Sequence, residues 1–441
     1  MHTGGSGFSR RRLLGLAAGG AVAAGGTAGG FVLGRETGPA VAASAVDTYP
    51  FLGVHQAGII TPAQGRMHTA AFDVTSDSVD DLVSLLRRWT AMAARLTQGD
   101  PAGEYGPASG PYDAPPDDTG EAMGLSPSGL TLTFGFGRSI FVSDGADRFG
   151  LADRLPAAFV ELPHFPQDAL EPARCGGDLI VQACADDPQV AVHAIRNLSR
   201  TAFGTATIRW SQLGYGRTSS TSRTQETPRN LFGFKDGTAN VMAEDSDLLA
   251  EHVWVRAADA EPDAGSSDWM TGGSYLAARR IRMIVETWDR TSLGEQEAIV
   301  GRTKGEGAPL SGGTESSEPD FALAGRGDVP LIAPRSHLRL AHPSSHGGAM
   351  MLRRGYNYTD GSDELGRLDA GLFFVAFVRD PRTHYIPVQN TLSREDVMME
   401  YLRHTGSGLF AVPPGVPEGS RLDADDGAFV GAALFRRTSS A

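Results

Sequence analysis

The first half of this chain alternates apolar segments in an order that few folds can accommodate. A helix is predicted between Ser78, which begins a capping box, and Gly99, and a second helix over residues 188–202. The segments with the alternating or apolar pattern of β-strands are 68–75, 130–136, 178–185 and 205–213. The resulting order of strand, helix, strand, strand, helix, strand is the ferredoxin-like α+β arrangement.

The second half repeats this pattern less clearly. Ser292 begins a short predicted helix, and Ser393 begins another that runs to His404. The predicted strands are 280–287, 338–341, 349–352, 371–379 and 409–412. We therefore predict an α+β fold of tandem duplicated ferredoxin-like domains with antiparallel sheets.

The predicted boundary between the two domains lies in a segment rich in Ser, Thr and Arg, residues 217–229. It separates an N-terminal domain, residues 46–222, from a C-terminal domain, residues 223–441. A chain of 441 residues with 41% hydrophobic content is long enough and apolar enough to give each domain a core.

The N-terminal segment is typical of an export signal. Arg10 and Arg11 precede a mildly apolar run rich in Ala and Gly, which is the pattern of a twin-arginine signal and too weak for a membrane anchor. Ala43-Ser44-Ala45 fits a cleavage site, so residues 1–45 are predicted to be a signal peptide. We expect twin-arginine export to an extracellular or cell-envelope location. Because that route carries folded proteins, it also suits a protein that binds its cofactor before export.

The charge balance argues against two classes of partner. The formal net charge is −13, and removal of residues 1–45 takes away four arginines and one glutamate, which gives −16. Such a chain is not expected to bind nucleic acid or to dock tightly on an anionic membrane surface. The oligomeric state is left open by the sequence.

Two further features have no assigned role. Cys175 and Cys184 are the two cysteines, and they can either pair in an oxidising compartment or remain as buried thiols. Residues 99–129 are rich in Gly, Pro, Asp and Ser and are predicted to form a long surface loop.

His337 is the first candidate for chemistry. It lies on a short apolar run with Leu338 and Leu340, so that its ring can point into a dry cavity, where neutral imidazole suits a transition metal or haem iron. A satisfied core histidine fits the same pattern. His342 and His346 follow at a spacing that also allows a copper or zinc site.

Asp236 and Arg353 are candidates to act on a bound peroxide. Asp236 lies next to Gly237, so it is either a turn residue or a carboxylate able to move one proton between two oxygens. Arg353 would supply fixed positive charge to the separating oxygen. Because side chains alternate along a strand, only one of Arg353 and Arg354 can face inward, and Arg354 is expected at the surface.

A histidine that binds metal needs a partner for its other ring nitrogen. Glu400 has apolar neighbours on the predicted C-terminal helix, and it is the predicted partner of His337; a solvent-exposed helix face is the alternative for this residue.

Several motifs resemble those of the dye-decolourising peroxidases, and in particular the twin-arginine-exported branch of that family. Gly233-x-x-Asp236-Gly237 is similar to the family's GxxDG motif, within the longer run Asn230–Asn240. The quoted segments that resemble its proximal, distal and C-terminal segments are Ser336–Pro343, Leu352–Tyr356 and Gly406–Phe410 with Pro413-Pro-Gly415. The similarity extends over essentially the whole chain after the signal.

This resemblance implies an enzyme that reduces hydrogen peroxide and oxidises phenolic or dye-like donors through a ferryl intermediate. It implies one haem b per chain, held mainly by the second domain and without covalent attachment, since the chain has no C-x-x-C-H. His337 becomes the axial ligand of the iron, Asp236 the distal acid–base residue and Arg353 the distal arginine. The residues implied to lie against the haem are Gly237, Thr238, Ala239, His342 and Phe374.

Other functions remain open. Relatives of the exported branch are associated with iron uptake, so the chain can instead be a haem- or iron-handling protein of the deferrochelatase type, using the same axial histidine. Electron donors can be small molecules or proteins. Aromatic residues at the surface are candidates to carry electrons from bulky donors, and these are Trp254, Trp269, Tyr356 and Tyr358; packing in the buried core is the alternative for each of them.

Overall fold

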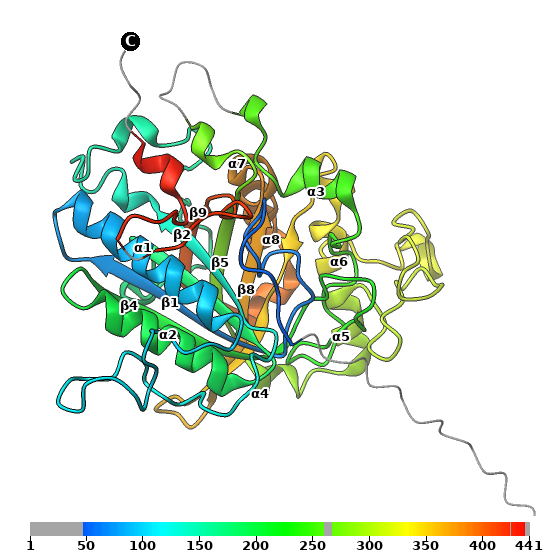
Figure 1. Ribbon diagram of the computed structural model, residues 1–441. Coiled ribbons are helices and arrows are strands. Elements are labelled where there is room, and N and C mark those ends of the chain that lie inside the picture. Colours follow the sequence, from blue (N-terminus) through cyan, green and yellow to red (C-terminus); the bar gives the residue numbers. More distant parts are fainter. Residues whose placement is uncertain (1–46, 260–266, 424, 437–441) are drawn as a thin grey trace, which may run out of the picture. The chain divides into compact units, whose positions relative to one another are not determined.

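A computed structural model of the chain describes residues 47–259, 267–423 and 425–436, so the predicted signal peptide lies outside the described residues. The elements are β1 (Arg66–Val74), α1 (Val79–Leu96), β2 (Thr131–Gly137), β3 (Leu179–Ala185), α2 (Pro188–Ala202), β4 (Ala206–Arg217), α3 (Ser246–His252), β5 (Ser274–Met283), α4 (Val285–Trp288), α5 (Leu293–Val300), α6 (His337–Ala341), β6 (Leu352–Arg353), β7 (Tyr356–Ser362), β8 (Leu368–Val378), α7 (Pro381–His384), α8 (Ile386–Glu395) and β9 (Leu402–Val412) (Figure 1). Within this described part, no helix has the length and apolar character needed to cross a membrane.

The first half folds as the sequence predicts. Its four strands form an antiparallel sheet in the order β2-β3-β1-β4, and α1 and α2 pack together on one face of it (Figure 1). Helix α1 begins after Ser78, whose side chain accepts a hydrogen bond from the backbone N–H of Asp81, and it buries its leucines and Trp89 against the sheet. The pairing order is that of a ferredoxin-like domain.

The second sheet repeats this order. Its strands pair as β9-β5-β8-β7, which is the order of the first sheet with β5, β7, β8 and β9 in the places of β1, β2, β3 and β4. The predicted duplication of a ferredoxin-like α+β unit is therefore confirmed. The exact boundary between residues 222 and 223 stays a prediction.

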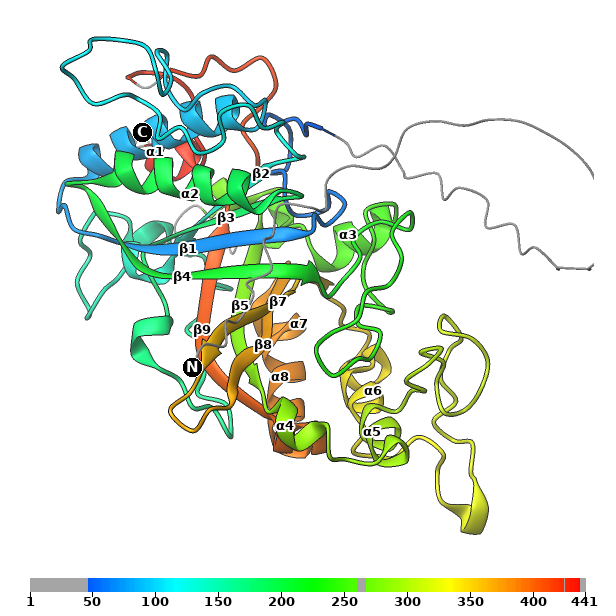
Figure 2. The ribbon, with the colours of Figure 1, turned by 90° about the horizontal axis from the view of Figure 1, so that it is seen from below.

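The two sheets share both of their edges. Strand β2 pairs with β9 at Phe136–Gly137, and β4 pairs with β7 at Tyr215–Arg217, so the strands form a closed ring of antiparallel pairs. Figure 2 shows the strands of the first sheet running across those of the second. The inner face of the ring is filled by an apolar cluster that includes Met67, Ile180, Trp210, Leu276, Tyr356, Phe373 and Phe410.

One buried glutamine joins the β2–β9 edge where strand pairing is short. Gln56 Nε2 donates to the carbonyl oxygens of Phe134 and Pro413 at 3.0 and 2.9 Å, and its Oε1 accepts from the N–H of Phe134 at 2.8 Å. Its amide thus satisfies backbone groups that a longer strand would have paired.

The second half departs from the predicted elements in several places. Residues 338–341 form helix α6 instead of a strand, because a run this short has the same apolar pattern in either conformation. The strand predicted at 280–287 lies earlier, at Ser274–Met283. The single helix predicted from Ser393 to His404 is wrong: α8 ends at Glu395, Asp396 is extended, Val397–Tyr401 form a short 3-10 helix, and Leu402–Val412 form β9, the edge strand of the second sheet that pairs with β2.

A buried ionic cluster connects Asp168, in the segment that precedes β3, to the second sheet. Arg279 of β5 donates to Asp168, to Ser407 Oγ at 3.0 Å and to Nδ1 of His404 at 3.2 Å. His404 is 3% exposed, and burial together with the neighbouring guanidinium lowers its pKa to about 3. The imidazole is therefore a neutral acceptor in the folded protein.

This lowered pKa predicts a loss of stability in mild acid. In the unfolded chain the histidine has a pKa of about 6.5. As the pH falls below that value, the unfolded state binds a proton that the folded state does not bind, and this favours unfolding. At pH 4.5 the loss from this one group is about 3 kcal/mol. The measurement is the free energy of unfolding by urea at pH 7 and pH 4.5 in the parent protein and in His404→Gln, which keeps an acceptor but does not titrate. The difference between the two pH values should be smaller in the variant by about that amount; equal differences would contradict the assignment.

Candidate functional site

A cavity of about 250 Å³ lies between the second sheet and helices α6 and α8. Its apolar wall comes from alternate residues of the sheet, Ile281 and Met283 of β5 and Leu372 and Phe374 of β8. Its polar groups come from segments that are far apart in sequence: Asn230, Asp236, Arg302, His337, Arg353 and Asp396. The three principal residues predicted from sequence, Asp236, His337 and Arg353, thus line one cavity.

His337 begins helix α6, and its ring is fixed by a buried carboxylate. Its Nδ1 lies 2.7 Å from Oδ2 of Asp396, whose Oδ1 accepts from the N–H of Met398 at 2.9 Å. A carboxylate can only accept, so Nδ1 carries the hydrogen and Nε2 of the neutral ring keeps a free lone pair. The side chain is 37% exposed and lines the cavity. This arrangement suits a metal ligand.

The pKa of His337 reports the charges around the cavity. Burial lowers this pKa, but the charge and hydrogen bond of Asp396 outweigh burial, so that the net shift is upward. Asp236 also raises this pKa and Arg353 lowers it. The imidazole, the carboxylate and the guanidinium therefore share one electrostatic environment.

Asp236 is held by a tight glycine turn. Gly237 has a φ of +84°, and a Cβ there would lie 2.8 Å from Cα of Ser219, so only glycine fits. The N–H of Asp236 donates to the carbonyl oxygen of Pro228 at 2.9 Å, and Asn230 Nδ2 donates to Asp236 Oδ2 at 3.1 Å. The turn therefore fixes both the backbone and one carboxylate oxygen.

Arg353 faces Asp236 from the short strand β6. Its Nη1 lies 3.5 Å from Oδ1 of Asp236, and both side chains are partly exposed to the cavity. Arg354 points the other way, as strand alternation predicts, but the prediction that it lies at the surface is wrong. It is fully buried, and its guanidinium donates to uncharged oxygens of Thr61, Gln64 and Thr221.

The less specific predictions divide into two groups. The residues implied to lie against the haem all line the cavity, namely Gly237, Thr238, Ala239, His342 and Phe374. The prediction for Glu400 is wrong. Glu400 is exposed and does not line the cavity, and the partner of His337 is Asp396, four residues earlier. The error follows from the helix predicted through this region, since the chain leaves α8 at Asp396.

Sequence reasoning missed other polar residues of the cavity, among them Asn230 and Arg302. Asn230 lies within the run that carries the GxxDG motif, so its contact with Asp236 had a signal in sequence. Arg302 follows α5 with no pattern to mark it. It is buried, it donates to the carbonyl oxygens of Gly307 and Glu315, and burial lowers its pKa.

The three histidines at 337, 342 and 346 do not converge. His342 contacts Glu318 at 3.2 Å and Ser344, while His346 Nε2 lies 2.6 Å from the carbonyl oxygen of Leu340. Over residues 47–259, 267–423 and 425–436, no group of three or more His, Cys, Asp or Glu side chains is arranged to hold a metal ion. The alternative of a copper or zinc site on these histidines has no support from this geometry.

The remaining candidates lie away from solvent or away from the cavity. The four aromatic residues considered as electron carriers at the surface are buried, as the alternative of core packing predicts: Trp254, Trp269, Tyr356 and Tyr358. Cys175 and Cys184 are free thiols, and burial raises the pKa of both. The segment 99–129 contributes no residue to the cavity lining and is held to α2 through Asp118 and His193, whose contact is 2.9 Å.

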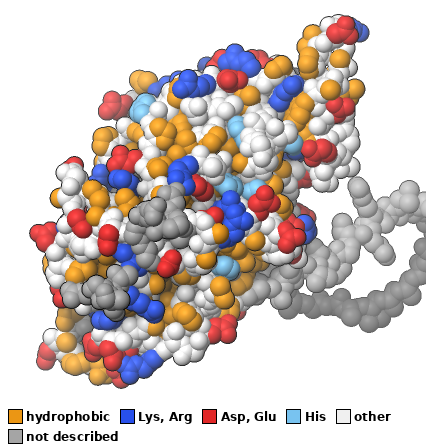
Figure 3. All heavy atoms as spheres, turned by 90° about the horizontal axis from the view of Figure 1, so that it is seen from above, with side chains coloured by type: hydrophobic (Ala, Val, Ile, Leu, Met, Phe, Trp, Pro, Cys, Tyr) orange, Lys and Arg blue, Asp and Glu red, His pale blue; other side chains and the backbone are white. Residues whose placement is uncertain are grey.

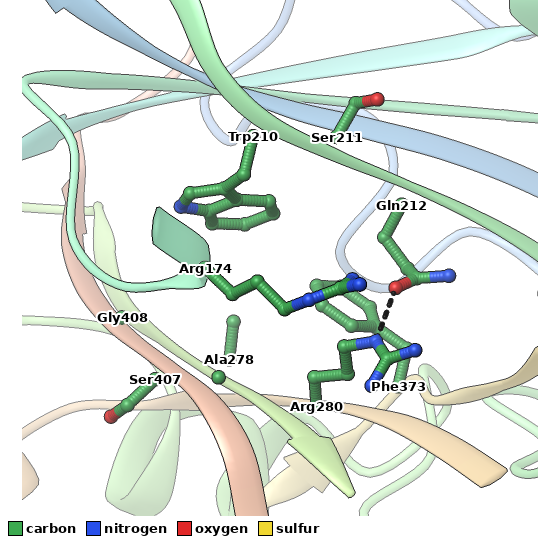
Figure 4. A pocket seen from close by; sticks show the side chains of 10 residues that line it. Arg174, Trp210, Ser211, Gln212, Ala278, Arg280, Phe373, Ser407 and Gly408 are labelled. Carbon is green, nitrogen blue, oxygen red and sulfur yellow. Dashed lines mark hydrogen bonds between the residues drawn. The ribbon is translucent and has the colours of Figure 1, made fainter. Parts of the chain in front are cut away.

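A second, much smaller cavity lies on the inner side of the same sheet. It has a volume of about 10 Å³, and it is lined by Trp210, Arg174, Gln212 and Arg280 among others (Figure 4). The guanidinium of Arg280 is already engaged by Gln212, Thr405, Asp360 and Asp369. This space is about that of one water molecule and does not suit a larger ligand.

Among the described residues, the face of the protein seen in Figure 3 has no large patch of side chains of one charge. Acidic, basic and apolar side chains are interspersed there.

Comparison with known proteins agrees with this geometry. The model of the Dyp-type peroxidase N-terminal domain matches residues 56–216, and that of the C-terminal domain matches residues 227–417. A curated relative, "Deferrochelatase" of Escherichia coli strain K12, is 40% identical over 391 residues, which is 88% of this chain and 87% of the relative.

Solved structures are similar over the same extent. Ferric DtpA from Streptomyces lividans is 40% identical with a TM-score of 0.76, covering 88% of this chain and 96% of that one. A DyP-type peroxidase from Cellulomonas bogoriensis is 36% identical with a TM-score of 0.75, covering 88% and 98%. From its two matched domains and these relatives, the chain belongs to the Dyp-type peroxidases, a family of haem-dependent peroxidases.

Proposed function

We propose that this chain is an exported haem b peroxidase that binds one haem without covalent attachment. In this proposal it reduces hydrogen peroxide and oxidises phenolic or dye-like donors. The observation that carries the proposal is the cavity in which His337, backed by Asp396, shares one electrostatic environment with the Asp236–Arg353 pair. Family membership supports the peroxide chemistry and the use of haem.

The residues of the cavity fit a haem. His337 offers a lone pair on Nε2, while its Nδ1 is held by a carboxylate that strengthens the imidazole as a ligand. The apolar wall from β5 and β8 suits the face of a porphyrin, and the cations Lys235 and Arg302 at the lining suit its carboxylates. When bound, haem supplies the iron that exchanges electrons with peroxide and with the donor.

The side chains on the peroxide side have separate tasks in this proposal. Asp236 takes a proton from one peroxide oxygen and returns it to the other, which leaves as water. Arg353 stabilises the negative charge that develops on the departing oxygen. Asn230 holds Asp236 Oδ2 at 3.1 Å, so the carboxylate is oriented before peroxide enters.

Substitution of either residue should slow the reaction with peroxide. We expect Asp236→Asn to lower the second-order rate constant by about 10²–10⁴-fold, because proton transfer is lost, and Arg353→Leu by about 10²–10³-fold, because a charge stabiliser is lost. The measurement is the change of the Soret band in a stopped-flow instrument after mixing with peroxide. Asp73→Asn, which removes a carboxylate paired with Arg209 away from the cavity, is the matched control. If both variants react at the parent rate, the roles of Asp236 and Arg353 are wrong.

Loss of the carboxylate behind His337 should weaken haem retention. In Asp396→Leu the Nδ1–H loses its acceptor and the imidazole becomes a poorer ligand, so haem is expected to leave about 10–100-fold faster. Transfer of haem to apomyoglobin gives this rate directly. Glu400→Gln is the control, since Glu400 is exposed, and it should release haem at the parent rate. Equal effects of the two substitutions would contradict the role of Asp396.

The export part of the proposal rests on the sequence of residues 1–45 alone. Replacing Arg10, Arg11 and Arg12 by lysine should leave the precursor in the cytoplasm, because the export machinery reads the arginine pair. Fractionation of the expressing cells, followed by N-terminal sequencing of the exported form, tests both the route and cleavage before Val46. Export of the triple lysine variant at the parent level would contradict this part.

A second function is favoured by the name of the curated relatives. Because these are named "Deferrochelatase", release of iron from haem is the alternative for this chain. Incubation of the purified protein with haem in the absence of peroxide, monitored by the fluorescence of iron-free porphyrin, separates the two. Porphyrin release that survives Asp236→Asn would favour the alternative; donor oxidation that needs Asp236, without porphyrin release, would favour the peroxidase.

A further inference from the structure

The side-chain amide of Asn240 is bonded to the backbone of Arg353 as a neighbouring strand would be. Asn240 Nδ2 donates to the carbonyl oxygen of Arg353 at 2.8 Å, and the N–H of Arg353 donates to Asn240 Oδ1 at 2.7 Å. The same amide nitrogen donates to the carbonyl oxygen of Ser220 at 2.9 Å. Asn240 is 6% exposed, so these bonds are shielded from water and costly to leave unmade.

Strand β6 needs this contact because it is short. Its two residues, Leu352 and Arg353, pair with Phe377 and Ala376 of β8 on one side only. On the other side, the backbone N–H and C=O of Arg353 are taken by Asn240. An aliphatic side chain of similar size offers neither donor nor acceptor, and a serine hydroxyl carries both on one atom instead of the two separate atoms used here.

The position of the Arg353 guanidinium depends on the position of the backbone that carries it. Its contact with Asp236 is long, at 3.5 Å, and an arginine side chain has many rotamers. A shift of the Arg353 backbone would therefore move the guanidinium relative to Asp236 and to the peroxide that the proposed function places beside them. A misplacement of about 1 Å can cost about 10²-fold in rate.

Asn240 also connects the two peroxide-side residues. It closes the turn that follows Asp236, since its backbone N–H donates to the carbonyl oxygen of Gly237 at 3.2 Å. The segment from Asp236 to Asn240 thus joins the carboxylate to the two hydrogen bonds that Asn240 makes with the Arg353 backbone, which we call the clamp. One short turn and one side-chain amide therefore link the backbone of Asp236 to the backbone of Arg353.

We infer that Asn240 is a positioning residue of the peroxide site, which acts by fixing the backbone of Arg353 against the Asp236 turn. The inference rests on the proposed function, in which Arg353 acts on peroxide. It assigns Asn240 no contact with peroxide, so its effect must pass through Arg353.

The test compares four variants of the full-length, haem-loaded protein with the parent: N240A, R353L, the double variant N240A/R353L, and N197A. Asn197 is the matched control, because it is a buried asparagine of α2 outside the cavity lining, and its side chain donates to the carbonyl oxygen of His193 at 3.0 Å and accepts from the N–H of Thr119 at 3.2 Å. The readouts are the second-order rate constant for peroxide, the dissociation constant for fluoride at the ferric haem, the haem content and the melting temperature.

N240A is expected to react with peroxide about 10–100-fold more slowly than the parent and to bind fluoride more weakly, because the anion loses a placed guanidinium. N197A should lose comparable thermal stability and keep both constants within about threefold of the parent, the spread expected for substitutions remote from a site. In N240A/R353L the rate should fall no further than in R353L, since both changes remove the same contribution.

Three results would overturn the inference: an N240A rate within threefold of the parent, fluoride affinity unchanged in N240A, or a double variant slowed beyond R353L by the full N240A factor. If N240A does not fold or hold haem, the same comparison is made with N240S, which leaves a smaller cavity. If R353L itself reacts at the parent rate, the role that the proposed function gives to Arg353 is wrong. If R353L is slow but N240A is not, only the positioning role of Asn240 is wrong, so the two failures are distinguishable.

Discussion

Pairing of the two sheets along both edges is the constraint on which the site depends. Because β2 pairs with β9 and β4 with β7, the inner faces of both sheets are committed to the common apolar cluster. The second sheet can then offer only its outer face to a ligand, through residues such as Ile281 and Phe374. Helices α6 and α8 cover that face without filling it, and the cavity is the space left between them and the sheet.

The cavity combines rigid polar groups with an adaptable wall. Each of its principal polar residues is held by a second side chain: His337 by Asp396, Asp236 by Asn230, and the backbone of Arg353 by Asn240. Polar groups held in this way cost little reorganisation when a reaction develops charge. The wall beside them is apolar and includes methionines, which fit irregular ligand surfaces.

Long-range structure also explains why single predictions failed where they did. Arg354 was expected at the surface because arginine is mostly exposed, but oxygens of Thr61, Gln64 and Thr221 replace water around its guanidinium. Glu400 was chosen as the partner of His337 on the assumption of one continuous helix. Helix α8 instead ends at Glu395, and the extended backbone of Asp396 turns its carboxylate toward the imidazole.

The sequence by itself determined the duplicated fold and the identity of the main residues. Local patterns, such as the Ser78 cap and the alternation of the strands, define the first half because they depend on neighbours a few residues apart. The GxxDG turn requires glycine at 237 for the same local reason. Only the tertiary structure decided the closed ring, the partner of His337 and the clamp on Arg353. These depend on contacts between residues far apart in sequence, and no local pattern carries that information.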